Sequence, residues 1–283
     1  MFDKKLGQAV ETFSALVLPL SEKDLERTWI WKDHDEEGIR FAFFVTLQEL
    51  RDLAVTLSAL RSKPTLAQHI LSQYHAAYLD LQAALLGISD ADAEQEPAAG
   101  EWPVQKAYAH ILSTELNFTI TIRYALEQHR LGRWTPNRIS DTDADRLAGI
   151  RDEDYLALIK RPLSEMAAYH RELHQVIVDE FTSITDQELE LPAIFWEETR
   201  FRIRHRLHRY EAHFVQHTVQ IDKTLDAIGR PPSESKRLLR KVFAALAEAE
   251  GMMIGARKAD DAAIYATASS IEERTNEIGS LLQ

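Results

Sequence analysis

The sequence predicts an all-α protein, and three observations support this prediction. Glycine (10) and proline (9) are few among the 283 residues, whereas Ala, Leu, Glu and Arg are plentiful. No window alternates Val, Ile or Thr strictly with polar residues, as a half-buried strand would. Apolar residues instead recur at the spacing of amphipathic helices. A chain of this length can bury a sizeable core, so we expect one main helical bundle with extensions.

The first helix is expected over residues 3–18, where apolar residues recur at helical spacing until Pro19 ends the segment. A connector then leads to a second helix over residues 38–61. Together they form an N-terminal helical pair, residues 1–64, which could belong to the same domain as the bundle that follows.

Four further helices are expected within residues 65–230, the main bundle. They span residues 65–86, 104–130, 152–183 and 198–228. Pro103 suits the first turn of the second of these helices, and Pro162 should interrupt or offset the third. A polar loop around Trp134 is expected to connect the second of these helices to the third.

The remaining residues, 231–283, form a C-terminal helical extension. Gly229 and the prolines after it end the bundle, and Ser233 is a good N-cap for a helix over residues 234–250. A last helix is expected over residues 260–282. These helices could cover the bundle or build the interface of a homodimer.

Three connectors, residues 20–25, 88–93 and 184–189, resemble one another, and each leads to a tryptophan and then a helix. They could mark an internal repeat, or they could show only that a capping residue followed by acids is a common start for a helix. All five tryptophans lie in or beside connectors, where we expect them to cap the bundle ends: Trp29, Trp31, Trp102, Trp134 and Trp196.

Composition also excludes several classes of function. Acidic residues outnumber basic ones by 45 to 33, and the resulting net charge of −12 repels a phosphate backbone, so nucleic acid is not an expected partner. The chain has no cysteine, so a metal would need His and carboxylate ligands, and any reacting thiol would come from a small molecule. With no long apolar run and no signal-like N-terminus, we expect a cytoplasmic protein without membrane contacts.

Two histidines on the fourth bundle helix form half of a metal site. His213 and His217 are four residues apart, so their imidazoles lie about 40° apart around the helix axis and can reach one ion. An open metal site usually has three protein ligands, and His110 is the candidate for the third. Its helix face is polar throughout and is expected to line a cavity and bind substrate through Thr114, Asn117 and Thr121.

Other polar residues have competing interpretations. His170 and His174 are also four apart, but we interpret them as a solvated or supporting pair rather than a primary site. Glu115 is a candidate general base or ligand-orienting group, yet at five residues from His110 it points about 140° away, so a structural salt bridge is an equal alternative.

Three arginines continue the helix face that holds His213, and they could hold an anionic substrate: Arg202, Arg206 and Arg209. Arg206 and Arg209 are the substrate-binding candidates. The alternative is a solvated basic face that balances an acidic protein, and we favour that alternative.

The segment Gly100-Glu-Trp102-Pro-Val104, which leads to His110 and Glu115, and the later His213-x3-His217-x2-Gln220 together resemble the DinB/YfiT-like superfamily. The likeness covers roughly residues 65–230 and rests on spacing more than on identical runs. It implies an up-down-down-up four-helix bundle, with a zinc or nickel ion held by one histidine from the second helix and two from the fourth. Members include thiol transferases and isomerases that use low-molecular-weight thiols such as bacillithiol or mycothiol.

Two functional hypotheses follow. In the first, His110, His213 and His217 hold a divalent ion that activates a water or a thiol, for hydrolysis or thiol transfer on a small molecule. In the second, the protein is a non-catalytic binding or stress-response module with a structural or vestigial site; the N-terminal pair, with Phe44 and Thr46 in place of histidine, shows that a similar unit can lack ligands. DNA-damage chemistry, which the family name suggests, is disfavoured by the charge balance.

Overall fold

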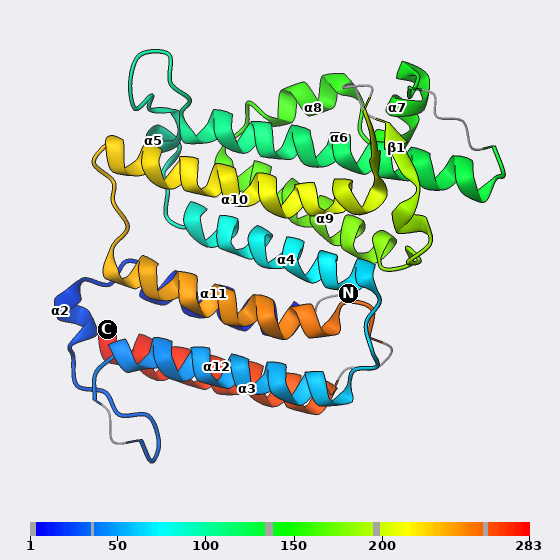
Figure 1. The fold of residues 1–283 in the computed structure, drawn as a ribbon. Coiled ribbons are helices and arrows are strands. Elements are labelled where there is room, and N and C mark those ends of the chain that lie inside the picture. Colours follow the sequence, from blue (N-terminus) through cyan, green and yellow to red (C-terminus); the bar gives the residue numbers. More distant parts are fainter. Residues whose placement is uncertain (1–3, 35–36, 134–137, 195–198, 257–259) are drawn as a thin grey trace. The chain divides into compact units, whose positions relative to one another are not determined.

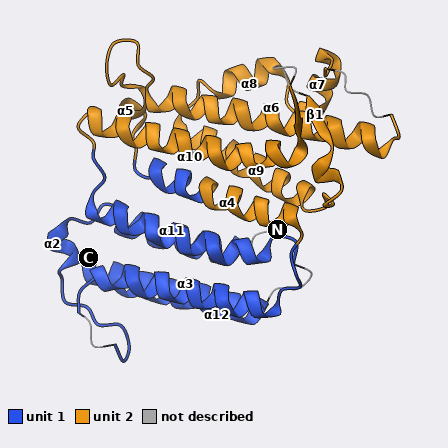
Figure 2. Cartoon of the chain, in the orientation of Figure 1, with its two compact units in different colours: residues 1–64, 79–87, 231–283 blue, residues 65–78, 88–230 orange. Residues whose placement is uncertain are grey.

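The fold is described from a computed structural model of the chain, which describes residues 4–34, 37–133, 138–194, 199–256 and 260–283 (Figure 1). These residues are mostly helical, with a single two-stranded sheet, so the predicted all-α class is confirmed. The chain divides into two compact units (Figure 2). Unit 1 holds Met1–Pro64, Leu79–Gly87 and Pro231–Gln283, and unit 2 holds Thr65–Tyr78 and Ile88–Arg230.

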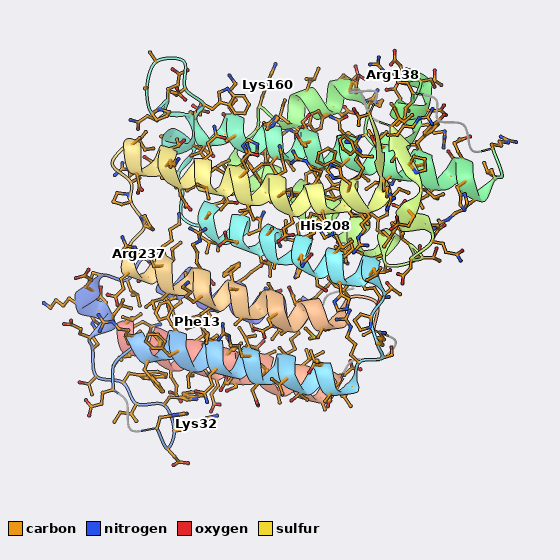
Figure 3. All side chains as sticks on the ribbon, viewed as in Figure 1. Phe13, Lys32, Arg138, Lys160, His208 and Arg237 are labelled. Carbon is orange, nitrogen blue, oxygen red and sulfur yellow. The ribbon has the colours of Figure 1, made fainter. Side chains whose placement is uncertain are left out.

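Unit 1 combines helices from both ends of the chain. Its elements are α1 (Lys4–Val17), α2 (Glu22–Leu25), α3 (Arg40–Leu60), α11 (Glu234–Met253), α12 (Asp261–Leu282) and the last part of α4 (Leu66–Leu85). Helix α1 packs on α12, and α3 packs on α11. Phe13, labelled in Figure 3, meets Phe43 edge to face with 5.4 Å between the ring centroids, and both rings are buried.

Unit 2 contains the first part of α4 and the elements that follow it up to α10. These are α5 (Asp90–Glu94), α6 (Val104–Arg130), α7 (Asp141–Ala148), α8 (Asp152–Leu158), α9 (Leu163–Phe181), the 3₁₀ turn η1 (Glu188–Glu190), β1 (Pro192–Ile194), β2 (Arg200–Arg202) and α10 (Ile203–Ala227). The two strands are antiparallel, with Ala193 opposite Phe201.

Hydrogen bonds between helix ends define the order of the bundle. The Gln105 side chain, at the start of α6, donates to the carbonyl of Arg161, just before α9, so these two helices run in parallel. Thr224, near the end of α10, donates to the carbonyl of Trp102, just before α6, so α10 runs the other way. At the start of α4, the Leu66 amide donates a hydrogen bond to the Asp186 carboxylate, which follows the end of α9, so α4 runs antiparallel to α9. Helices α4, α6, α9 and α10 therefore follow the predicted up-down-down-up order.

Most predicted helices match the observed ones to within a few residues, with two exceptions. Residues 200–202, predicted as helix, form strand β2 instead, because they pair with β1 in a hairpin too short to show an alternating pattern. Helix α7 lies in the expected crossover loop, where Ser140 caps its start and Gly149, at φ 71°, ends it in the left-handed conformation. The predicted break near Pro162 is confirmed, since α8 ends before it and α9 starts after it.

The three similar connectors share one local structure. Ser21, Ser89 and Thr185 each accept a hydrogen bond from the amide three residues later and bond that residue's carboxylate. Each is therefore a capped helical turn between two long helices. Trp29 and Trp31 follow the first turn and are buried in unit 1, whereas Trp134 and Trp196 lie outside the described residues.

In the described part of the chain, no helix combines the length and the apolar character that crossing a membrane would need.

Candidate metal centre

Three histidines from two antiparallel helices meet in unit 2. His110 comes from α6, and His213 and His217 come from successive turns of α10. One potential ligand atom from each imidazole lies within 4.8 Å of the other two. His110 Nε2 and His213 Nε2 lie 3.1 Å apart. His213 and His217 are buried, and His110 is half-buried.

The donor set suits a divalent ion. Two nitrogens bound tetrahedrally to zinc at about 2.05 Å lie about 3.3 Å apart, close to the separation of the His110 and His213 nitrogens. Burial, then the neighbouring His217 and His110 and the Arg209 guanidinium, lower the pKa of His213 to about 3. Burial and His217 also lower the pKa of His110. Both imidazoles are therefore neutral near pH 7, which is the form that binds a metal.

Surrounding side chains hold the imidazoles in place. Gln220, one turn after His217, lies with its Oε1 2.7 Å from His217 Nδ1, so the other ring nitrogen is left for the centre. The Trp102 ring packs edge-on against His110, with 5.2 Å between centroids, and Phe118 packs edge-on against His213. The site thus has one polar support and two aromatic walls.

A family comparison agrees with this arrangement. The family model described as the DinB superfamily matches residues 73–221, more than half of the chain, and the match contains all three histidines. The chain belongs to the DinB superfamily. No curated protein and no solved structure matches the sequence.

The predicted polar stripe of this DinB bundle is largely buried. Thr114 is 8% exposed and Thr121 is 1% exposed, and the Thr121 hydroxyl donates to the carbonyl of Asn117 in its own helix. Asn117 is half-buried on the same face of α6. Arg209 is half-buried, and its positive charge acts on His213. Of these candidates, Asn117 and Arg209 remain partly open to solvent.

Arg206 is held by the hairpin. It is only 2% exposed, its Nη2 donates to the carbonyl of Ala193 in β1 at 3.4 Å, and its guanidinium lies 4.9 Å from the centroid of Phe201 in β2. The favoured interpretation of a solvated basic face is therefore wrong for this residue. Its observed contacts fasten the hairpin to the start of α10.

Glu115 lies in a second polar cluster, in the core of the DinB bundle. Its two carboxylate oxygens contact the Tyr74 hydroxyl and, at 2.8 Å, His170 Nε2. The other ring nitrogen of His170 is 3.0 Å from the Tyr108 hydroxyl. All four side chains are buried. The structural alternative for Glu115 is the one that these contacts support.

His174 extends this cluster towards α4. Its Nε2 lies 2.9 Å from Nδ1 of His75, and its ring stacks on Tyr78 with 3.8 Å between centroids. His170 is 0% exposed and His174 is 2% exposed, so of the two expected roles, a solvated or a supporting pair, the solvated one is wrong. Sequence reasoning missed His75, because its neighbours Tyr74 and Tyr78 belong to what looks like an ordinary apolar stripe. The one sequence signal that could have identified His75 was its position, as a polar residue, next to that apolar stripe.

Proposed function

We propose that the protein is a divalent-metal-dependent enzyme that acts on a small molecule, either as a hydrolase or as a thiol transferase. One observation supports this most: His110, His213 and His217 bring three imidazole donors together from two helices, and the lowered pKa values of His110 and His213 favour the neutral, metal-binding form of these two. Three protein ligands leave a coordination position for water or substrate, as in catalytic zinc sites. Zinc or nickel fits the all-nitrogen set.

Each residue has a defined task in this proposal. The three histidines hold the ion, and Gln220 fixes the orientation of His217. When bound, the ion would lower the pKa of a water or thiol and so supply a nucleophile near pH 7. Arg209 and Asn117 are the candidates to contact the substrate, because both are partly exposed, Asn117 lies on the helix that carries His110 and the Arg209 charge acts on His213. Because the chain has no cysteine, a thiol nucleophile would be a low-molecular-weight cosubstrate.

The decisive experiment is metal analysis of tag-free protein. About one equivalent of zinc or nickel per chain is expected, and the double variant His213→Ala with His217→Ala should lose it. The matched control, His205→Ala with His208→Ala, removes two exposed histidines from the same helix and should keep the metal. Native protein without stoichiometric metal, or unchanged metal in the His213 and His217 variant, would overturn the proposal.

A non-catalytic role with a structural metal site is the second candidate. It is favoured by the position of Glu115, the candidate general base, whose carboxylate contacts Tyr74 and His170 in the bundle core. Within the described residues, the metal-binding group contains no carboxylate. Thermal melting with and without chelator, combined with a screen of thiol and ester substrates, separates the two roles. Strong stabilisation by metal without turnover would favour the non-catalytic one.

The proposed setting is the cytoplasm, with no nucleic acid or membrane as partner, and with a homodimer as the proposed assembly. The charge of −12 supports the exclusion of nucleic acid as a main partner. Light scattering of the purified protein measures the assembly directly, because a dimer doubles the mass of the 32.4 kDa chain.

A further inference from the structure

A surface hollow lies where the hairpin meets α10. It has a volume of about 430 Å³, and β2 and the first turns of α10 line it through Arg200, Phe201, Arg202, Arg204, His205 and His208. This volume lies in the range of small-molecule pockets, which is about 300–1,000 Å³. All six lining residues are basic or aromatic.

The charge of this hollow is opposite to that of the whole chain. Residues 200–209 contain five arginines and no acidic residue, in a protein with a net charge of −12. Arg202 forms an ion pair with Glu190, and Arg204 lies 4.0 Å from the same carboxylate, so two guanidinium groups share one negative charge. Arg200 is exposed and forms no ion pair in the part of the chain that the structure describes. Among the described residues at this place, positive charge therefore exceeds negative charge.

The aromatic wall of the hollow is rigid. The rings of Phe201 and His205 stack at 4.2 Å with an interplanar angle of 15°. The buried Arg206 guanidinium lies over Phe201 and also bonds the hairpin, so the ring is fixed between strand and helix. A fixed ring beside arginines offers both a stacking surface and forked hydrogen-bond donors.

The hollow is separate from the three-histidine site. His208 is five residues before His213, so the two side chains point about 140° apart around α10. His208 is exposed, whereas His213 is buried, and Figure 3 labels His208 on this helix. A ligand in the hollow would not bind through the three imidazoles.

We propose that this hollow binds the phosphate groups of a phosphorylated small molecule. Guanidinium groups bind phosphate oxygens through paired, charge-assisted hydrogen bonds, and three arginines from β2 and α10 surround one space. A ligand with two or more adjacent phosphates fits best, because it can bridge arginines on both elements. A planar base on such a ligand would stack against Phe201 or His205.

The test is calorimetric titration of metal-free, full-length protein with sodium tripolyphosphate and with ATP, at a salt concentration of about 0.15 M, where nonspecific attraction is screened. Saturable binding at one site per chain is expected for both probes. The double variant Arg200→Ala with Arg204→Ala should bind at least tenfold more weakly. The matched control, Arg151→Ala with Arg161→Ala, removes the same charge from exposed residues elsewhere in unit 2 and should bind within twofold of the native protein.

The results separate the possible sources of binding. Tighter binding of ATP than of tripolyphosphate assigns the ligand to the nucleotides, and equal binding assigns recognition to the phosphates alone; either supports the site. The absence of saturable binding would overturn the proposal, as would equal weakening in both arginine variants. Loss of binding in the His213→Ala with His217→Ala variant would place the anion at the imidazoles and also overturn it. None of these results depends on whether the protein is a metal enzyme.

Discussion

Gln220 is the residue whose role can be tested most directly. Its Oε1 lies 2.7 Å from His217 Nδ1, so Gln220→Ala removes the group that fixes this imidazole. Loss of such a supporting bond typically weakens metal binding about 10- to 100-fold. We expect a loss of this size for zinc, measured by competition with a chromophoric chelator.

The control for this experiment is Gln216→Ala. Gln216 is exposed on α10, one turn earlier, and forms no hydrogen bond with the imidazoles in the described structure. Its substitution should leave zinc affinity unchanged. Equal affinities for the two variants would show that His217 keeps its orientation without Gln220.

Glu115 should matter for stability and not for metal binding. Its buried carboxylate contacts Tyr74 and His170, and leaving a buried polar group without its partner typically costs about 1–3 kcal/mol. Glu115→Gln should therefore lower the free energy of unfolding in urea by roughly 2 kcal/mol. Glu127→Gln, which breaks a surface pair with Arg146, should change it by less than about 1 kcal/mol. A stable Glu115→Gln protein that binds zinc normally but lacks turnover would instead identify a catalytic base.

His174 should make the protein less stable in mild acid. Burial, together with His75 and His170, holds the pKa of His174 well below its usual 6.5. Below pH 6.5 the unfolded chain therefore binds a proton that the folded chain does not, so stability falls as the pH falls. This group alone contributes a slope that approaches about 1.4 kcal/mol per pH unit. Urea titrations of metal-free protein between pH 6 and 5 should show that the free energy of unfolding falls less steeply for His174→Gln than for the native protein. For the exposed His129→Gln it should fall as steeply as for the native protein.

The partners of a residue could be predicted from the sequence when they lie on the same helix, and not when they lie on another element. His213 and His217 share a face because of their spacing alone, so they could be predicted from one stretch of sequence. His110 required the bundle order, which came from a family resemblance. His75 pairs with a residue 99 positions later, and nothing in its own segment indicates that partner. Arg206 also depends on a distant contact, with the β1 carbonyl of Ala193.

Among the elements, the capped connectors test how local sequence positions a long helix. The Ser89 hydroxyl accepts from the Asp92 amide and bonds its carboxylate, which defines the turn before α6. Ser89→Ala should lower the free energy of unfolding by about 1 kcal/mol, as for other N-caps. Ser280→Ala, at an exposed site in the last turn of α12, serves as control and should have a smaller effect. Equal effects would mean that the cap does not define the connector.

Long helices and caps were predictable because both depend on neighbours in sequence. The hairpin was not, because each strand has only three residues and the pairing joins Pro192 to Arg202, which are not neighbours in sequence. It matters for the site nonetheless: its second strand supplies half of the phosphate hollow, and its first strand binds the buried Arg206. The hairpin, which has no periodic sequence pattern, therefore contributes to both the hollow and the packing of Arg206.

At the scale of the whole molecule, the two units should respond differently to metal. All three histidines lie in unit 2, on α6 and α10, while unit 1 has its own core around Phe13 and Phe43. An ion that binds only the folded state stabilises it by about 2.7 kcal/mol at a hundred times its dissociation constant. Zinc should therefore slow hydrogen exchange in α6 and α10 and leave α3 and α11 nearly unchanged, as measured by mass spectrometry of peptides.

The His213→Ala with His217→Ala variant provides the reference for this measurement. It removes two of the three ligands, so added zinc should not slow exchange in either unit. Protection of α3 and α11 as strong as that of α6 and α10 would mean that the units unfold as one cooperative body, and the effect of zinc would then extend over the whole chain. Protection confined to unit 2 would instead make the metal a local stabiliser of the DinB bundle, with unit 1 independent of it.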